Sequence, residues 1–399
     1  MLEILVGKKE NEKEIALIEN GKLKEYYVEE EQLIRKEGNI YIGIIKDIVK
    51  GMQAAFVDIG TERNSFIHLK DLLPKIDETK KIQEHKKNIN NKKIEEIAKK
   101  GDKILVQVKK DSNIQKGARV STHINLTSKY VVLMPNTDII TVSQKIEDKK
   151  EQERLIKVVK ENIKEGNGAI IRTSAIGKEK EIIEDIKKIE RKWEKIEQQF
   201  KSNKENRPKL IIKAEDIIEK MIIDLPEKTL NRILVNNKKE YEEILQLKEQ
   251  YRYLENIKIE LIEKKEIFEI YDVKKEISKM QNRKIWLKCG GFITIDRTEA
   301  LTAIDVNTGK YTGTKDLEQT IYKVNEEATI EIAKQLRLRD IGGIIIIDYI
   351  DMHIAENKEK IKQLLIENLK NDRSKTQVEG FTKLDLMEMT RKHICSHKE

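Results

Sequence analysis

The stretch Gly342-Gly343-Ile344-Ile345-Ile346-Ile347-Asp348 decides how the last part of this chain folds. An unbroken β-branched run of this length predicts a strand that is covered on both faces of its sheet. The run closes on Asp348. Burying a carboxylate without a partner has a large desolvation cost, so we expect this side chain to meet a cation or the edge of the sheet.

A second aspartate closes an earlier predicted strand. The segment 298–309 (TEALTAIDVNTG) contains Asp305 and Asn307 near its end. Residues 316–338, between the two strands, carry apolar side chains at helical spacing. Strand, helix and strand form a crossover unit that brings both strand ends to one edge of a sheet. We therefore expect the two aspartates and the amide to converge where a hard cation and a phosphate could bind.

From the residues alone, a metal site is the minority interpretation of these aspartates. Two strand-end carboxylates in an α/β domain are more often caps or ion-pair partners. The surrounding motifs, EALTAIDVNTG at 299–309 and QLRLRDIGGIIIIDYIDM at 335–352, resemble the catalytic region of the ribonuclease E/G family. That resemblance runs through most of the chain in family order. It implies that Asp305 and Asp348 hold one Mg²⁺ and that Asn307 supports the scissile phosphate.

Composition bounds the class of protein. The 399 residues are 38% charged and 5% aromatic, so the cores must be mainly Ile, Leu and Val. The net charge of +8 fits a phosphate-rich partner, although it is a modest excess over 71 acidic residues. Two cysteines make no disulfide framework, and no segment approaches the ~18 consecutive apolar residues of a membrane span. The N-terminus lacks a basic leader, so we expect a cytoplasmic protein.

Short strands punctuated by glycine occupy residues 39–69 and 103–126 and predict a small β-barrel. Their sequence resembles that of an S1 domain, an RNA-binding barrel of the OB class. Residues 74–100 interrupt it with a tract of Lys, Glu, Asn and Gln that is too polar to build a core. We expect a mobile loop or a solvated helix on the barrel surface there.

Two phenylalanines of the predicted barrel are candidates for stacking on RNA bases. From the pattern alone, Phe56 and Phe66 are more often core residues, because every second strand residue faces inward. The family resemblance reverses this preference, since it places RNA-binding phenylalanines at these positions together with Lys116. Ser65 stands where the family usually has glycine.

The resemblance also implies a sensor for the 5′-monophosphate of RNA. It assigns the phosphate contacts to Arg172 and Thr173, backbone support to Ser128 and an apolar contact to Val132. A guanidinium and a hydroxyl are good phosphate donors.

The sensor departs from the family at three positions. Ser128 replaces a glycine, Gln144 matches a pocket arginine, and Lys375 matches the arginine of the C-terminal part. Lysine keeps the charge but loses the bidentate geometry, so sensing is expected to be weaker. Arg373 could substitute only if the local backbone shifted.

We expect no zinc site. The Cys-Pro-x-Cys motif that joins two family chains through zinc is absent, and the chain ends on residues 391–399 with one cysteine and two histidines. A lone Cys-x-His tail is far more often incidental than a ligand set. A homodimer stays one possibility, and it would have to form through contacts other than a shared zinc.

The resemblance implies an α+β chain of several subdomains. Residues 1–37 and 209–279 would form an RNase H-like subdomain, 38–127 the S1 barrel with its charged insertion at about 75–100, 128–208 the 5′-sensor, and 280–399 a DNase I-like catalytic subdomain. The implied function is a Mg²⁺-dependent endoribonuclease. It would cut A/U-rich single-stranded RNA to 5′-phosphate and 3′-hydroxyl ends, in ribosomal RNA processing and messenger RNA decay. The alternative is a non-catalytic RNA-binding protein that keeps the barrel.

Overall fold

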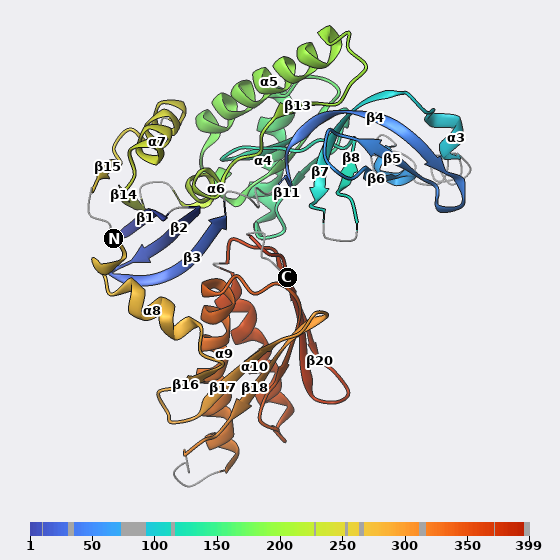
Figure 1. Ribbon diagram of the computed structural model, residues 1–399. Coiled ribbons are helices and arrows are strands. Elements are labelled where there is room, and N and C mark those ends of the chain that lie inside the picture. The colour runs from blue at the N-terminus through green and yellow to red at the C-terminus, as the bar shows by residue number, and fades with distance from the viewer. Residues whose placement is uncertain are drawn as a thin grey trace. The chain divides into compact units, whose positions relative to one another are not determined.

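The structure is a computed structural model of the chain (Figure 1). It describes residues 1–9, 11–30, 36–72, 93–112, 116–226, 229–251, 254–262, 267–310, 317–370 and 372–394. The chain divides into two compact units: Met1–Ile34 with Leu225–Glu399, and Arg35–Asp224. Most of the predicted charged insertion, and the cysteine and second histidine of the tail, lie outside the described residues.

The Arg35–Asp224 unit contains a closed five-stranded barrel, which confirms the prediction of an OB-type barrel. Its strands follow the order β4-β5-β6-β8-β7, and β4 pairs again with β7. They are β4 (Ile40–Val49), β5 (Ala54–Asp58), β6 (Ser65–His68), β7 (Lys103–Lys110) and β8 (Arg119–Ser121), with the short helices α1 (Leu69–Leu72) and α3 (Ile94–Ile97).

The long strand β4 closes the barrel. Its first half pairs with β7 and its second half with β5, and the register shifts between Ile45 and Asp47. Such an irregularity bends a strand and increases its twist, which lets one strand serve both neighbours. Figure 1 shows β4 curving over the barrel. Gly43 is required in this curve, because a Cβ there would lie 2.5 Å from Cγ1 of Val57.

The rest of this unit is a four-stranded sheet, in the order β11-β12-β10-β9, packed against two helices. Helix α5 buries an isoleucine-rich stripe with Trp193 and carries charges on its other faces. The elements are β9 (Leu126–Thr127), β10 (Val131–Pro135), β11 (Ile140–Val142), α4 (Lys149–Asn162), β12 (Asn167–Ile171), α5 (Glu179–Ser202), β13 (Lys209–Ile212) and α6 (Ile217–Asp224). Strand β13 pairs with β4 of the barrel.

The other unit begins with a five-stranded sheet in the order β15-β14-β1-β2-β3. The first three strands form an antiparallel meander, and β1 pairs in parallel with β14, far along the chain. The elements are β1 (Leu2–Lys9), β2 (Glu12–Glu19), β3 (Lys22–Glu30), β14 (Leu230–Val235), α7 (Lys238–Gln250), β15 (Lys258–Leu261) and α8 (Val273–Met280). Its RNase H-like type stays a prediction, as do the predicted subdomain boundaries.

The second sheet of this unit carries the predicted catalytic residues. Its order is β16-β17-β18-β19-β21-β20, and β18 and β19 are parallel. The elements are β16 (Lys284–Trp286), β17 (Phe292–Arg297), β18 (Leu301–Asn307), α9 (Leu317–Leu338), β19 (Gly343–Asp348), α10 (Ala355–Leu369), β20 (Thr376–Phe381) and β21 (Leu386–Arg391). The predicted strand–helix–strand crossover is confirmed in β18, α9 and β19. Its DNase I-like type stays a prediction.

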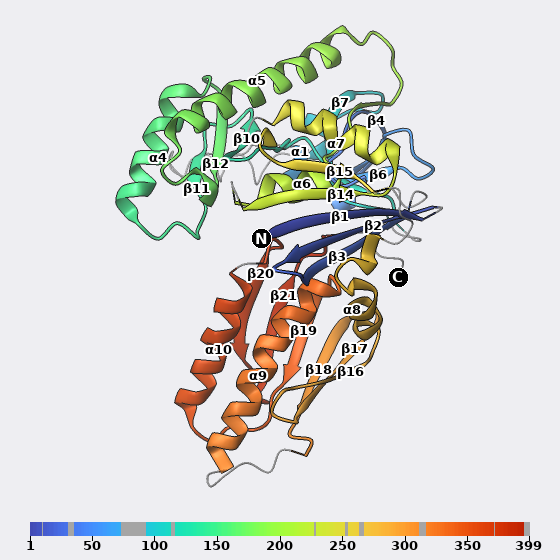
Figure 2. The same cartoon turned by 90° about the vertical axis from the view of Figure 1, so that its left-hand side faces the viewer.

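The helices α9 and α10 pack side by side (Figure 2), and their apolar faces share one core with the buried face of the sheet. The prediction that β19 is covered on both faces is wrong. Ile344 is 51% exposed, and Asp348 is also exposed. The crossover helix lies on one face only, so alternate residues of the isoleucine run point to an open face. No helix that the structure describes has the length and apolar composition of a membrane span.

Candidate active site

Asp305 and Asp348 lie directly opposite one another on the open face of the second sheet. They are register partners at the ends of the parallel strands β18 and β19. Their Cα atoms therefore belong to neighbouring strands, about 4.8 Å apart in a regular sheet, and their side chains leave the same face. Both are exposed, while Ile304 and Val306 on either side of Asp305 are buried. Strand alternation thus brings the two predicted ligands together.

The two carboxylates face one another without a neutralising partner. Within the described residues, neither forms a salt bridge. Burial raises the pKa of Asp348, and the negative charges of Asp305 and Asp351 raise it further. A carboxyl group whose pKa is raised by burial and by like charges beside it is a common sign of a functional site. Arg283, a nearby cation, is engaged by Asp296 on β17.

Asn307 is part of the same cluster. Its Nδ2 donates a hydrogen bond of 2.5 Å to Oδ2 of Asp305. This contact orients the carboxylate and leaves the amide beside the aspartate pair. The sequence-based grouping of these three residues agrees with this geometry, and their roles stay predictions.

The donor set fits Mg²⁺ better than a metal that needs a full protein cage. No group of three or more His, Cys, Asp or Glu side chains suited to a metal occurs among the described residues. Mg²⁺ commonly binds through one or two carboxylates and completes its octahedron with water and substrate phosphate oxygens. Two facing carboxylates on an open surface supply that partial set. The tail histidine within the described residues, His393, is bonded to the backbone oxygen of Asp340.

Sequence reasoning missed the residues that hold the loop after Asp348. Asn325 of α9 is fully buried, and its amide accepts from N of Ile350 at 3.1 Å and donates to O of Ile350 at 2.8 Å. Thr329, one helical turn later, bonds the hydroxyl of Tyr349. The available signal was two polar residues, four apart, in the apolar stripe of a predicted helix.

Phe56 and Phe66 form one aromatic pair on the barrel. They are register partners on β5 and β6, with ring centroids 6.3 Å apart at 71°. Phe56 is 39% exposed, so its interpretation as a core residue is wrong. Lys116 is exposed and lies two residues before Ala118, whose carbonyl accepts from N of Phe66. The three predicted RNA-binding residues therefore lie close together. Ser65, beside Phe66, is buried.

The predicted sensor arginine is already engaged. Arg172 donates to O of Ser128 at 2.8 Å and forms an ion pair with Asp224 at the end of α6. Sequence reasoning missed Asp224, because 52 positions separate it from its partner. The pair is partly exposed, with side-chain exposures of 23% and 27%. A 5′-phosphate at Arg172 would have to compete with this carboxylate.

Ser128 has its own buried partner. Its hydroxyl donates to Asp185 of α5, which also accepts from the backbone N–H of Tyr130 and Val131. Burial raises the pKa of Asp185, and these hydrogen bonds offset part of the rise. Ser128 is therefore anchored by its side chain, in a way that the family's glycine could not be.

The remaining sensor residues are spread over both units. Val132 is half-buried on β10 and Thr173 is exposed after β12. Gln144 is exposed after β11, and Lys375 is exposed before β20 in the other unit. Arg373 binds Glu25 in its own unit, at 2.9 Å from Nε to Oε2. It is therefore committed elsewhere.

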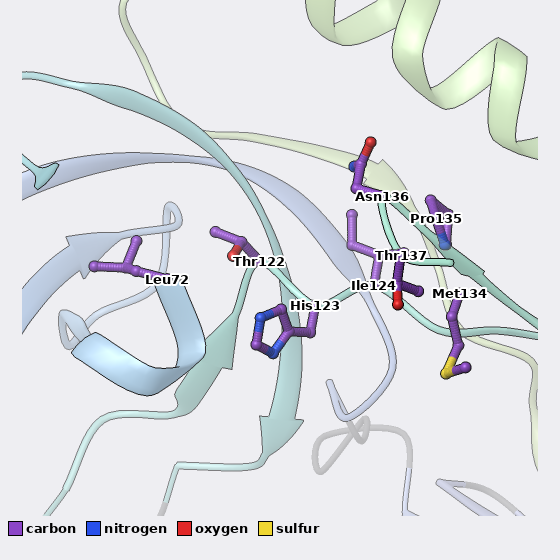
Figure 3. Close-up of a pocket in the computed structure, with 8 residues that line it drawn as sticks. All are labelled: Leu72, Thr122, His123, Ile124, Met134, Pro135, Asn136 and Thr137. Atoms are coloured by element: carbon purple, nitrogen blue, oxygen red, sulfur yellow. The ribbon is translucent and has the colours of Figure 1, made fainter. Parts of the chain in front are cut away.

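One hollow of ≈ 200 Å³ lies outside these sites, between the barrel and the four-stranded sheet of the same unit. Figure 3 shows His123 at its centre, with Leu72 and Met134 on opposite sides. None of the predicted catalytic, RNA-binding or sensor residues lines it.

Comparisons with known proteins point to one family along nearly the whole chain. The sequence model of the Ribonuclease E/G family matches residues 125–394. Ribonuclease G of Escherichia coli (strain K12) is 40% identical over 392 residues, which cover 98% of this chain and 79% of that protein. Ribonuclease G of Haemophilus influenzae is 38% identical over 394 residues, with coverages of 98% and 79%. Ribonuclease E of Nostoc sp. is 34% identical over 362 residues, covering 89% of this chain and 51% of that protein.

Proposed function

The chain belongs to the ribonuclease E/G family and is an endoribonuclease, and from this premise we propose that it cuts single-stranded RNA with the help of Mg²⁺ held by Asp305 and Asp348. The observation that carries the proposal is the facing of these two carboxylates, without an ion-pair partner in the described part of the chain, on an open sheet face. Two carboxylates that face one another without a salt bridge repel, and a bound divalent ion would offset that repulsion.

The protein groups have separate roles in this proposal. Mg²⁺, when bound, supplies an activated water and polarises the scissile phosphate. Asp305 and Asp348 provide the negative charge that holds the ion at the end of their strands. Asn307 orients Asp305 through its hydrogen bond and presents an amide to a phosphate oxygen. Asn325 acts through the backbone of Ile350 to keep the loop after Asp348 in place.

The products would carry 5′-phosphate and 3′-hydroxyl ends. Hydrolysis by a water nucleophile leaves the ribose 2′-hydroxyl intact. The preferred substrates would be A/U-rich unpaired segments of ribosomal RNA precursors and messenger RNA, in the cytoplasm.

The barrel would supply a further contact with the RNA. An exposed aromatic pair stacks on bases of any kind, and Lys116 adds a phosphate contact beside it. For a single strand, each neutralised phosphate adds about 0.7 to the slope of log affinity against log salt. We expect Phe56→Ala to weaken RNA binding by roughly tenfold and Lys116→Ala to lower the salt slope instead.

In the 5′-sensor, Arg172 would exchange its carboxylate partner for the terminal phosphate of the RNA. Arg172 would leave Asp224 for the terminal phosphate, with Thr173 as a second donor and Val132 beneath the first nucleotide. Zinc has no part in this proposal, and a homodimer would need contacts other than a zinc link.

The decisive experiment compares cleavage by four proteins on a short 5′-monophosphorylated single strand with Mg²⁺. Wild type should cut, and Asp305→Asn and Asp348→Asn should fall to background while still binding RNA. The matched control is Asp296→Asn, which changes an aspartate on the same sheet that is paired with Arg283. It should keep most of the activity. Cleavage at the wild-type rate by either active-site variant would refute the proposed metal ligands.

A further inference from the structure

An aromatic pair with one exposed ring and one half-buried ring lies on the sheet that carries the aspartate cluster. Trp286 of β16 is 56% exposed, which is unusual for the largest apolar side chain. Phe292 of β17 is its register partner, and the ring centroids lie 5.4 Å apart at 62°. Nζ of Lys284 lies 4.2 Å from the Trp286 centroid and 3.5 Å from that of Phe292. We call these three residues the Trp286 platform.

The sheet register places the platform next to the predicted chemistry. Phe292 is the register partner of Asn307, which bonds Asp305. Side chains at such directly opposite positions have Cβ atoms about 5 Å apart. Trp286 lies one strand further out in the same row, about 10 Å from Asn307 at the usual strand spacing. Platform and aspartates therefore share one face of one sheet.

The surroundings of the platform favour a polyanion over an apolar partner. Lys284 stands over both rings, and Lys288 and Lys310 are exposed at the adjoining turns. The backbone joins these turns, because N of Lys310 donates to O of Gly290 at 3.3 Å. Aromatic faces interleaved with lysines suit a single strand, since bases stack and phosphates pair with the cations.

We propose that the Trp286 platform stacks one unpaired base of the RNA close to the scissile phosphate. This inference rests on the proposed function, because it takes the cut to occur at Asp305 and Asp348. Trp286 offers the exposed ring, Phe292 supports it edge-on, and Lys284 holds a positive charge for the neighbouring phosphate. The platform would fix the register of the strand over Asn307, independently of the barrel. It would accept any base, because stacking requires only a flat π-face.

The test is RNA binding in an Asp305→Asn background, where the substrate stays intact. Each base of a short single strand is removed in turn as an abasic nucleotide, and affinities are measured with Trp286 and with Trp286→Ala. One abasic position should weaken binding roughly tenfold when Trp286 is present. The same abasic position should have little effect in Trp286→Ala. Trp286→Phe should restore most of the loss, because it keeps an aromatic face.

Intrinsic fluorescence gives a second readout. The chain has two tryptophans, and Trp193 is only 6% exposed, so Trp286 should supply the RNA-dependent quenching. The matched control is Ile344→Ala, which removes an equally exposed apolar side chain from β19 on the same sheet face. It should leave both affinity and quenching unchanged.

Three results would overturn the platform. These are no quenching, an abasic effect that persists in Trp286→Ala, or a Trp286→Ala protein that binds RNA normally but loses self-association. The last result would make this face an interface between two copies of the chain. Failure of the proposed function gives a different pattern, namely normal cleavage by Asp305→Asn, and leaves the binding measurements to decide the platform.

Discussion

The sheet that carries Asp305 and Asp348, together with the loops beside it, contains two groups of aspartates with opposite surroundings. Asp340 and Asp372 are buried and share the guanidinium of Arg391, each at 2.8 Å. Asp305 and Asp348 are exposed, face one another and form no salt bridge within the described residues. The same residue type is thus paired with a cation inside the protein in one group and left without a salt bridge at the surface in the other.

The difference separates aspartates that share a buried cation from aspartates that form no salt bridge. In the buried group, burial lowers the pKa of Arg391, but hydrogen bonding and charge from Asp372 and Asp340 raise it above its ordinary value. Every charge therefore has an opposite within contact distance. In the exposed group, neither carboxylate forms a salt bridge within the described residues, and the negative charge of Asp305 helps to raise the pKa of Asp348.

The largest expected effect comes from breaking the buried group. Arg391→Met leaves two buried carboxylates without their cation, so we expect a loss of ~3–5 kcal/mol in the free energy of unfolding. Urea denaturation of the full chain measures it. Arg283→Met is the matched control, because it breaks an exposed Arg–Asp pair, and it should change stability by less than ~1 kcal/mol. Equal losses in the two variants would contradict the comparison. If Arg391→Met is too unstable to purify, Asp372→Asn serves in its place.

Next in size is the stabilisation by Mg²⁺. A ligand that binds only the folded state adds ~2.7 kcal/mol at a hundredfold excess over its Kd. Wild type should therefore melt at a higher temperature with Mg²⁺, whereas Asp305→Asn and Asp348→Asn should show little change. Asp296→Asn should respond like wild type. A full response in Asp348→Asn would place the ion elsewhere.

A smaller effect concerns pH in the absence of metal. The pKa of Asp348 is raised above its ordinary value of 3.8, so the protonated form is favoured in the folded state. The contribution of Asp348 to the free energy of unfolding is therefore full below the ordinary pKa and is lost as pH rises through the raised pKa. Asp348→Asn should then be more stable than wild type at pH 7, by less than ~1 kcal/mol because the group is exposed. The gap should close as the pH falls towards 4 and reverse sign at pH 7 when Mg²⁺ is added. Thermal unfolding across this range measures both changes.

The smallest expected effect tests an intermediate case. The Arg172–Asp224 pair is partly exposed, so its carboxylate is neither locked in the core nor available for a metal. Asp224→Asn should release the guanidinium and increase the preference for 5′-monophosphorylated over 5′-hydroxyl RNA by up to about fivefold, the range of an exposed ion pair. Cleavage rates on the two substrates measure this preference. A reduced preference would show that Asp224 supports the sensor instead of competing with it.

The order of elements was accessible from the sequence because local patterns encode it. The isoleucine run, the helical spacing of 316–338 and the glycine-punctuated strands each predicted an element that the structure contains. Burial was harder to predict. The run at 344–347 was expected to be covered on both faces, but the helices pack on one face only. Pattern within a segment carries no information about what covers it from elsewhere in the chain.

The candidate site likewise combines residues that a local pattern could predict with residues that it could not. Asp305, Asp348 and Asn307 could be grouped from their strand ends alone, since a parallel crossover aligns such ends. Asn325 could not, because a polar helix residue has the same local appearance whether it faces solvent or clamps a loop. The ion pairs of Arg172 and Arg391 join residues far apart in the chain.

By itself, the sequence determined the family, the barrel, the crossover and the pair of strand-end aspartates, because short-range periodicity and contiguous motifs specify them. Only the tertiary structure decided which acidic side chains are paired with a cation and which form no salt bridge. Electrostatic pairing depends on separation in space, and folding alone sets those distances between residues that are remote along the chain.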